Sequence, residues 1–95
     1  MTSKQQKDIA TIKRKVCAYF DVTLKELEGP ARARRIVQAR RYAMFIVLQG
    51  TNLKQETIAE SFNKNHSTVH YSCVQMLKLM QGGEPVRETI TKILQ

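Results

Sequence analysis

Apolar residues recur every three or four positions along most of the 95-residue sequence, and no segment alternates apolar and polar residues. The first pattern is typical of helices with one buried face, and without the second there is no candidate for a β-strand. The sequence therefore predicts an all-α fold, a compact helical bundle of five or six helices. Its length suits one hydrophobic core, so we expect a single domain over residues 1–95.

Turn residues divide the chain into these helices. A flexible segment is expected over 1–7, because it is polar and precedes the first periodic residue, Ile9. Thr23 and Glu26 have the spacing of a capping box, and Gly29-Pro30 ends the short helix that follows. Gly50-Thr51-Asn52 has the composition of a C-cap followed by an N-cap. The predicted helices lie at about 9–21, between 23 and 29, and at 31–49, 53–62, 67–80 and 84–95, and the helix that ends at 62 can start anywhere from 53 to 55.

The charge of the chain is unusual. Sixteen lysines and arginines against eight acidic residues give a formal net charge of +8. Five arginines fall between Arg32 and Arg41, without an acidic residue among them. Clustered guanidinium groups bind phosphate bidentately, so nucleic acid is the favoured partner. The alternative is a solvated helix face, which is the usual fate of a charge run.

The segment 53–80 has the proportions of a helix-turn-helix. Two helices flank a short polar turn, Asn63–Asn65, and the second helix begins with short polar side chains. Such groups can bond base edges or phosphates when the helix end enters a major groove. The positive end of the helix adds attraction for phosphate.

Several segments resemble the C-terminal DNA-binding domain of the bacterial replication initiator DnaA. They are Ala39-Arg-Arg-Tyr-Ala-Met-Phe, Thr51, Ile58-Ala-Glu-Ser-Phe62, and Asn65-His-Ser-Thr-Val69 with Cys73. The resemblance covers most of 9–80. It implies a Trp-repressor-like fold that uses its helix-turn-helix to bind double-stranded DNA at an A/T-rich DnaA box of a replication origin.

The resemblance also implies roles for individual residues. Arg32 is placed in the minor groove, where the narrow groove of A/T-rich DNA attracts arginine. Arg40 and Thr68 correspond to phosphate contacts, and His66 and Ser67 to base contacts. We expect these residues to contact DNA: Arg32, Arg34, Arg40, Arg41, Lys64, Asn65, His66, Ser67 and Thr68.

The sequence departs from the family pattern in the turn and along the second helix. The turn is one residue shorter, and Asn65 replaces an aspartate. An amide can pair bidentately with adenine, whereas a carboxylate accepts from cytosine. Val74 and Gln75 stand where basic residues are usual. We therefore expect a site preference that differs from the usual box.

The chain contains no G-x-x-x-x-G-K-[ST] phosphate loop, so we expect DNA binding without ATPase activity. The start at Met1 slightly favours a free-standing protein over an excised domain. An initiator fragment, an origin blocker and a transcriptional regulator all remain open. DnaA itself or another replication protein is a further partner class, and oligomerisation is not required.

Other interpretations weigh less. A helical adaptor that docks on an acidic protein and a binder of structured RNA are the rivals. His66, His70 and Cys73 have helical spacing for zinc, but no fourth ligand is near, so we expect no metal or other cofactor. No arrangement of catalytic residues occurs, so we expect no enzyme.

The two cysteines are far apart in the sequence, so we expect both to be buried, reduced thiols. Together with the lack of a signal peptide, this predicts a cytoplasmic, nucleoid-associated protein.

Overall fold

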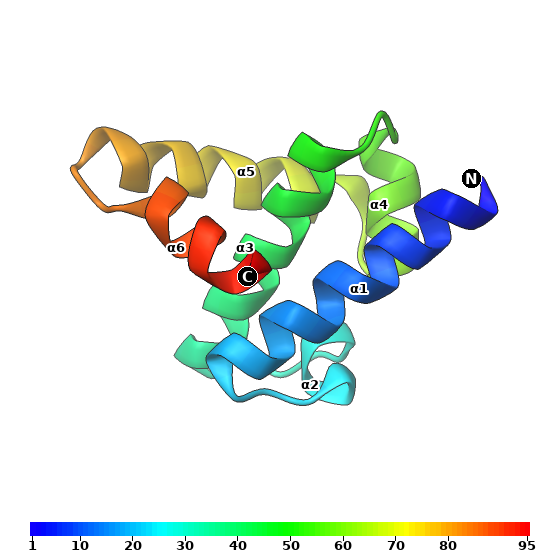
Figure 1. Cartoon of the computed structure of the whole chain (residues 1–95), viewed down its shortest axis with the longest axis horizontal. Coiled ribbons are helices and arrows are strands. Elements are labelled where there is room, and N and C mark those ends of the chain that lie inside the picture. The colour runs from blue at the N-terminus through cyan, green and yellow to red at the C-terminus, as the bar shows by residue number, and fades with distance from the viewer.

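The computed structural model describes residues 1–95 and contains six helices and no strand. This confirms the all-α prediction. In Figure 1, α3 runs through the middle of the molecule, with α1 on one side and α5 on the other. Helix α4 lies beside α5, α2 packs against α1 and α3, and α6 lies between α1 and α5. The helices are α1 (Ser3–Phe20), α2 (Leu24–Glu28), α3 (Arg34–Gly50), α4 (Gln55–Ser61), α5 (His66–Gln81) and α6 (Val86–Leu94).

Helix α3 is the centre of the hydrophobic core. Nine of its residues are buried, including a continuous run from Tyr42 to Val47. A helix that is apolar on almost every side in one segment has to be covered by neighbours on every side. Helices α1 and α5 supply the largest part of this cover. Met44 and Met76 lie in the core, as their helical spacing indicated.

Helix α1 begins six residues earlier than the apolar pattern predicted. Thr2 and Gln5 form a capping box, in which the Thr2 hydroxyl accepts from the Gln5 amide and the Gln5 side chain accepts from the Thr2 amide. These bonds satisfy amide groups that a helix start leaves free. Residues 3–7, expected to belong to a flexible segment, are therefore helical.

Other helix boundaries also differ from the expected ones. The capping box of Thr23 and Glu26 is confirmed. Helix α3 starts at Arg34, so Arg32 lies in the loop before it. The N-cap of α4 is Lys54 rather than Asn52, and Thr51 instead ends α3 with its hydroxyl bonded to the carbonyl of Val47 at 2.7 Å. None of the six helices is both long and apolar enough to cross a membrane.

The two cysteines are free thiols in different surroundings. Cys73 is buried in the core, whereas Cys17 is only half-buried, so the expectation of burial holds for one of them. Burial raises the pKa of both thiols, and for Cys17 the nearby Glu28 carboxylate raises it further.

A buried lysine joins three helices beneath the helix-turn-helix. Lys13 is only 7% exposed. Its ammonium group donates to the Glu28 carboxylate at 2.5 Å and to the carbonyl of Ser61. It also lies 4.5 Å from the centroid of the Phe62 ring. Lys13 sits on the same helix face as Ile9 and Val16, so it faces inward, and it finds polar partners there.

Replacing Lys13 with alanine should lower the free energy of unfolding by about 1.5 kcal/mol. Breaking one side of a buried pair costs more than this, but water reaches the Glu28 side chain and offsets part of the loss. Urea denaturation of the variant measures the effect. Lys15→Ala is the control, because Lys15 only reaches the carbonyl of Leu94 at an exposed site. Equal stability of the two variants would show that the pair contributes nothing.

Candidate nucleic-acid interface

The turn between α4 and α5 is a Schellman motif. Phe62 is the C-cap of α4, and Asn63 follows it with a φ of 57°, in the left-handed region. The amide of Lys64 donates to the carbonyl of Ala59 at 2.9 Å, and that of Asn63 to Glu60 at 3.1 Å. Asparagine tolerates this conformation better than other non-glycine residues. The motif turns the chain within three residues, and the fully buried Phe62 anchors it to the core.

Asn65 caps the start of α5. Its side-chain oxygen accepts three hydrogen bonds, from the Thr68 amide at 3.1 Å, the Ser67 hydroxyl at 2.6 Å and the Thr68 hydroxyl at 3.0 Å. A bidentate contact with adenine requires this same oxygen as an acceptor. The pairing that we expected for Asn65 is therefore replaced by a capping role, and only its amide N–H groups remain for DNA.

The first turn of α5 faces solvent. His66 and Ser67 are exposed, Thr68 is half-buried, and Val69 is the first residue of the helix that enters the core. The first amide groups of a helix have no partner within it, so this end also offers N–H donors and partial positive charge. The structure thus brings three of the predicted contacts, His66, Ser67 and Thr68, to one accessible helix end.

Arg40 lies beneath this surface and holds the loop before α3. We call residues 29–33 the basic loop. The Nε of Arg40 donates to the carbonyl of Leu27 at 2.8 Å, and its Nη2 contacts the carbonyls of Glu26, Gly29 and Ala31 at 2.9, 3.0 and 3.2 Å. The side chain is 7% exposed, and burial lowers the pKa of its guanidinium. These bonds give Arg40 a structural role. Its Nη1 donates to none of these carbonyls and the residue lines the cleft described below, so the phosphate contact expected for it stays a prediction.

Lys64 reaches the basic loop from the opposite side. Its Nζ donates to the carbonyl of Gly29 at 2.6 Å and lies 3.3 Å from that of Glu28. Burial, and the charge of Arg40 nearby, lower the pKa of this ammonium group. Lys64 therefore bonds the protein backbone instead of projecting freely toward solvent, as a phosphate contact would.

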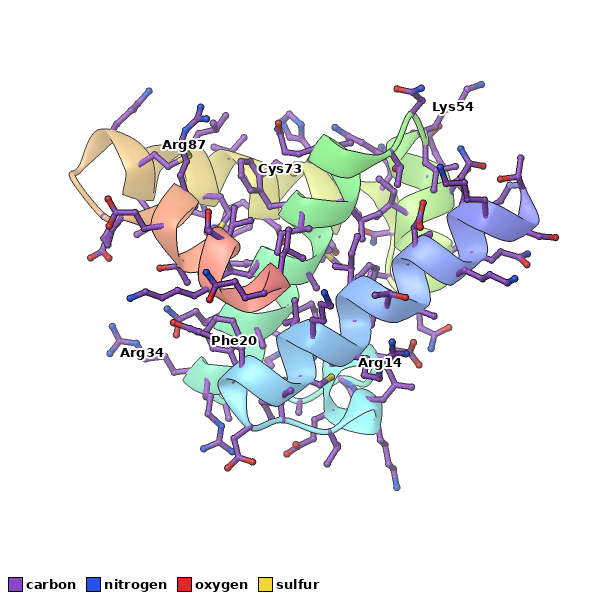
Figure 2. The ribbon with its side chains drawn as sticks, in the orientation of Figure 1. Arg14, Phe20, Arg34, Lys54, Cys73 and Arg87 are labelled. Atoms are coloured by element: carbon purple, nitrogen blue, oxygen red, sulfur yellow. The ribbon has the colours of Figure 1, made fainter.

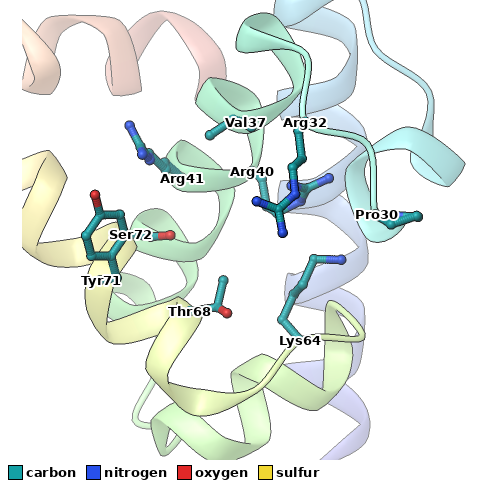
Figure 3. Close-up of a pocket in the computed structure, with 9 residues that line it drawn as sticks. All are labelled: Pro30, Arg32, Val37, Arg40, Arg41, Lys64, Thr68, Tyr71 and Ser72. Carbon is teal, nitrogen blue, oxygen red and sulfur yellow. The ribbon is translucent and has the colours of Figure 1, made fainter.

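A cleft of about 470 Å³ separates the basic loop and α3 from α5. Figure 3 shows Arg32 and Lys64 pointing toward each other on one side of it, with Arg41, Thr68 and Tyr71 around the other. A second cleft of about 330 Å³ adjoins it and is lined by Arg32, Arg34 and Arg41. Arg34 points outward from the first turn of α3 (Figure 2). Three guanidinium groups that bond no carbonyl thus line two adjoining clefts.

Tyr71 contributes to this surface in a way the sequence left open. It is 56% exposed, and the guanidinium carbon of Arg41 lies 5.7 Å from the centroid of its ring. A cation above an aromatic face is weakly attracted to it, so the ring orients the arginine. The zinc interpretation has no support in the geometry, since Cys73 points into the core while His66 and His70 are exposed.

Comparisons with known proteins agree with this geometry. The family model described as the bacterial dnaA protein helix-turn-helix matches residues 9–76. The chromosomal replication initiator protein DnaA of Nostoc punctiforme is 37% identical over 75 residues, which are 78% of this chain and 16% of that protein. The DnaA of Mycobacteroides abscessus is 40% identical over 63 residues, which are 66% of this chain and 13% of that protein. The match thus spans less than a fifth of either relative. The chain therefore belongs to the bacterial DnaA helix-turn-helix family.

Proposed function

We propose that the chain binds double-stranded DNA sequence-specifically, with the start of α5 in a major groove and Arg32 in the adjacent minor groove. The observation that carries this proposal is the arrangement of one face. Thr68, in the first turn of α5, lines one cleft with Arg32 and Arg41, and these two arginines line the adjoining cleft with Arg34. Membership of the DnaA family supports duplex DNA as the ligand.

The geometry supports separate roles for the site residues, some contacting bases and others contacting phosphates. His66 and Ser67 stand at the exposed end of α5 and are proposed to read bases. Arg34 and Arg41 border the cleft, from which guanidinium groups can grip phosphates in bidentate fashion. Thr68 and the free amides of the first helical turn suit a phosphate placed at the helix end.

The site preference follows from which groups are free. The Ser67 hydroxyl donates to Asn65, so its lone pairs face outward and accept from the amino groups of adenine or cytosine. Asn65 retains only donors. Arg32 favours a narrow minor groove, which is typical of A/T-rich sequence. We therefore propose an asymmetric site with an A/T-rich part on the side of the basic loop.

The biological setting is also a proposal. The matched relatives are chromosomal replication initiators, but the chain aligns with only 16% and 13% of their lengths. We propose that it occupies DnaA-box-like sites on nucleoid DNA. The ATPase function of a complete initiator has no counterpart here, since the sequence has no phosphate loop.

Replacing His66 with alanine should weaken binding to the preferred site about tenfold and relax specificity at the base it contacts. A good base contact contributes about 1–3 kcal/mol of discrimination between the correct base and a wrong one. DNA that lacks the correct base never forms this contact, so the affinity for such DNA should not change. Fluorescence anisotropy with a preferred duplex and a scrambled duplex measures both effects.

Arg14→Ala is the matched control for this experiment. Arg14 is exposed on α1 and does not line the cleft. Its variant should bind like the parent protein. Equal losses on both duplexes for His66→Ala would contradict base reading. Tighter binding to duplex RNA, whose deep groove excludes a helix, or to an acidic protein would contradict the proposed ligand.

A further inference from the structure

We infer that Lys64 is a positioning residue, which fixes the basic loop against the helix-turn-helix so that Arg32 and the start of α5 engage neighbouring grooves together. This inference rests on the proposed function. It concerns how the two parts of the DNA site are held at a set separation.

The basic loop has almost no backbone support of its own. Among the backbone hydrogen bonds outside the helices, only the bond from the Val37 amide to the Ala33 carbonyl, at 2.9 Å, involves residues 29–33. The other hydrogen bonds to the loop come from side chains. Arg40 bonds the carbonyls of Gly29 and Ala31, and Lys64 bonds that of Gly29.

The two side chains anchor the loop to different elements. Arg40 ties it to α3, the helix that follows the loop, so this anchor reaches α5 only indirectly, through the packing of α3 against α5. Lys64 belongs to the turn that precedes α5 and sits one residue before its N-cap, Asn65. The bond from Lys64 to Gly29 therefore links the loop that carries Arg32 to the end of the helix that carries His66.

Gly29 is suited to receive both anchors. A Cβ atom at this position would lie 2.7 Å from the carbonyl oxygen of Lys25, so only glycine fits without a shift of the backbone. Its carbonyl accepts from Arg40 at 3.0 Å and from Lys64 at 2.6 Å. The shared acceptor is a fixed point from which the loop extends over the cleft.

Holding the loop before DNA arrives should increase affinity. A loop released from α5 would have to be ordered on binding, and each residue that is fixed costs conformational entropy. Lys64 therefore acts through Arg32 rather than through a phosphate of its own. The two roles differ in a double-mutant cycle, because an interaction that works only through a second residue disappears when that residue is removed.

The test is a cycle of Lys64→Met and Arg32→Ala, read by anisotropy on the preferred duplex at several salt concentrations. Lys64→Met should reduce affinity about five- to tenfold when Arg32 is present and less than about twofold in the Arg32→Ala background. The slope of log affinity against log salt should not change with Lys64→Met, because no phosphate contact is lost. Lys64→Arg, which keeps donors for the two carbonyls, should stay within about twofold of the parent protein.

Two controls make the result decisive. Lys54→Met removes the same charge from an exposed residue outside the cleft and should leave affinity unchanged. Thermal unfolding of each variant separates loss of fold from loss of positioning. Equal losses in both backgrounds, or a slope shallower by about 0.9, would overturn the inference and show a direct phosphate contact. If the parent protein did not distinguish duplex sequences, the proposed function would fail together with the inference.

Discussion

Replacing Arg40 with alanine is expected to lower the free energy of unfolding by about 3 kcal/mol and, through the loop it holds, to abolish tight DNA binding. Hydrogen bonds that involve a charged group contribute about 1.5–3 kcal/mol each, and their removal leaves buried carbonyl groups without a partner. Arg40 contacts four such carbonyls, and neighbouring water can recover only part of the loss. A domain of this size has a total stability of about 5–10 kcal/mol, so a large share of it would be removed.

Chemical denaturation and anisotropy on the same samples measure both effects. Arg41→Ala is the matched control, since Arg41 borders the cleft and bonds no carbonyl. It should retain the stability of the parent protein and bind DNA more weakly. If Arg40→Ala instead kept full stability and weakened binding equally on every sequence, Arg40 would be a phosphate contact and the structural role would be wrong.

Raising the salt concentration from 50 to 200 mM is expected to weaken DNA binding about 40-fold. Each phosphate neutralised by a basic side chain contributes a slope of about −0.9 in log affinity against log salt. Three guanidinium groups at the cleft are free to neutralise phosphate charge, those of Arg34 and Arg41 by direct contact and that of Arg32 from within the minor groove. The expected slope is therefore close to −3.

This slope separates two views of the interface. If Arg40, for which the family resemblance implied a phosphate contact, and Lys64 also neutralised phosphates, five contacts would give a slope of about −4.5. A slope near zero would remove the electrostatic basis of the proposal altogether. Titrations at five salt concentrations between 50 and 400 mM resolve the three outcomes.

The sequence predicted most of the fold because its helices follow local rules. Apolar periodicity located α3 and α5 within a few residues, and the capping box of Thr23 and Glu26 located α2. The early start of α1 was missed, because the cap of Thr2 and Gln5 lies outside the apolar pattern. A cap acts through hydrogen bonds that hydrophobic periodicity does not report.

The candidate site was predicted less completely, for a physical reason. The sequence placed His66, Ser67 and Thr68 at the helix start, because their place relative to α5 follows from local spacing. Periodicity put Arg32 inside the helix predicted over 31–49, and only the family resemblance assigned it to a minor groove. It did not reveal that Arg40 and Lys64 bond the basic loop. Their acceptors are backbone carbonyls up to 36 residues away. Every residue has a backbone carbonyl, so the residue type at a position does not show which carbonyl accepts a side-chain bond. Lys13 was hidden for the same reason, since its burial depends on Glu28 and Ser61.

The central claim is that two neighbouring parts of the protein read two neighbouring grooves, and selection of bound duplexes from random DNA tests it most directly. The parent protein should enrich one asymmetric motif, with a specific block and an A/T-rich block about five base pairs apart, the spacing of adjacent grooves on one face. Selection with His66→Ala should lose information only in the first block, and selection with Arg32→Ala only in the second. Enrichment of no motif, or loss of both blocks with either variant, would contradict the account.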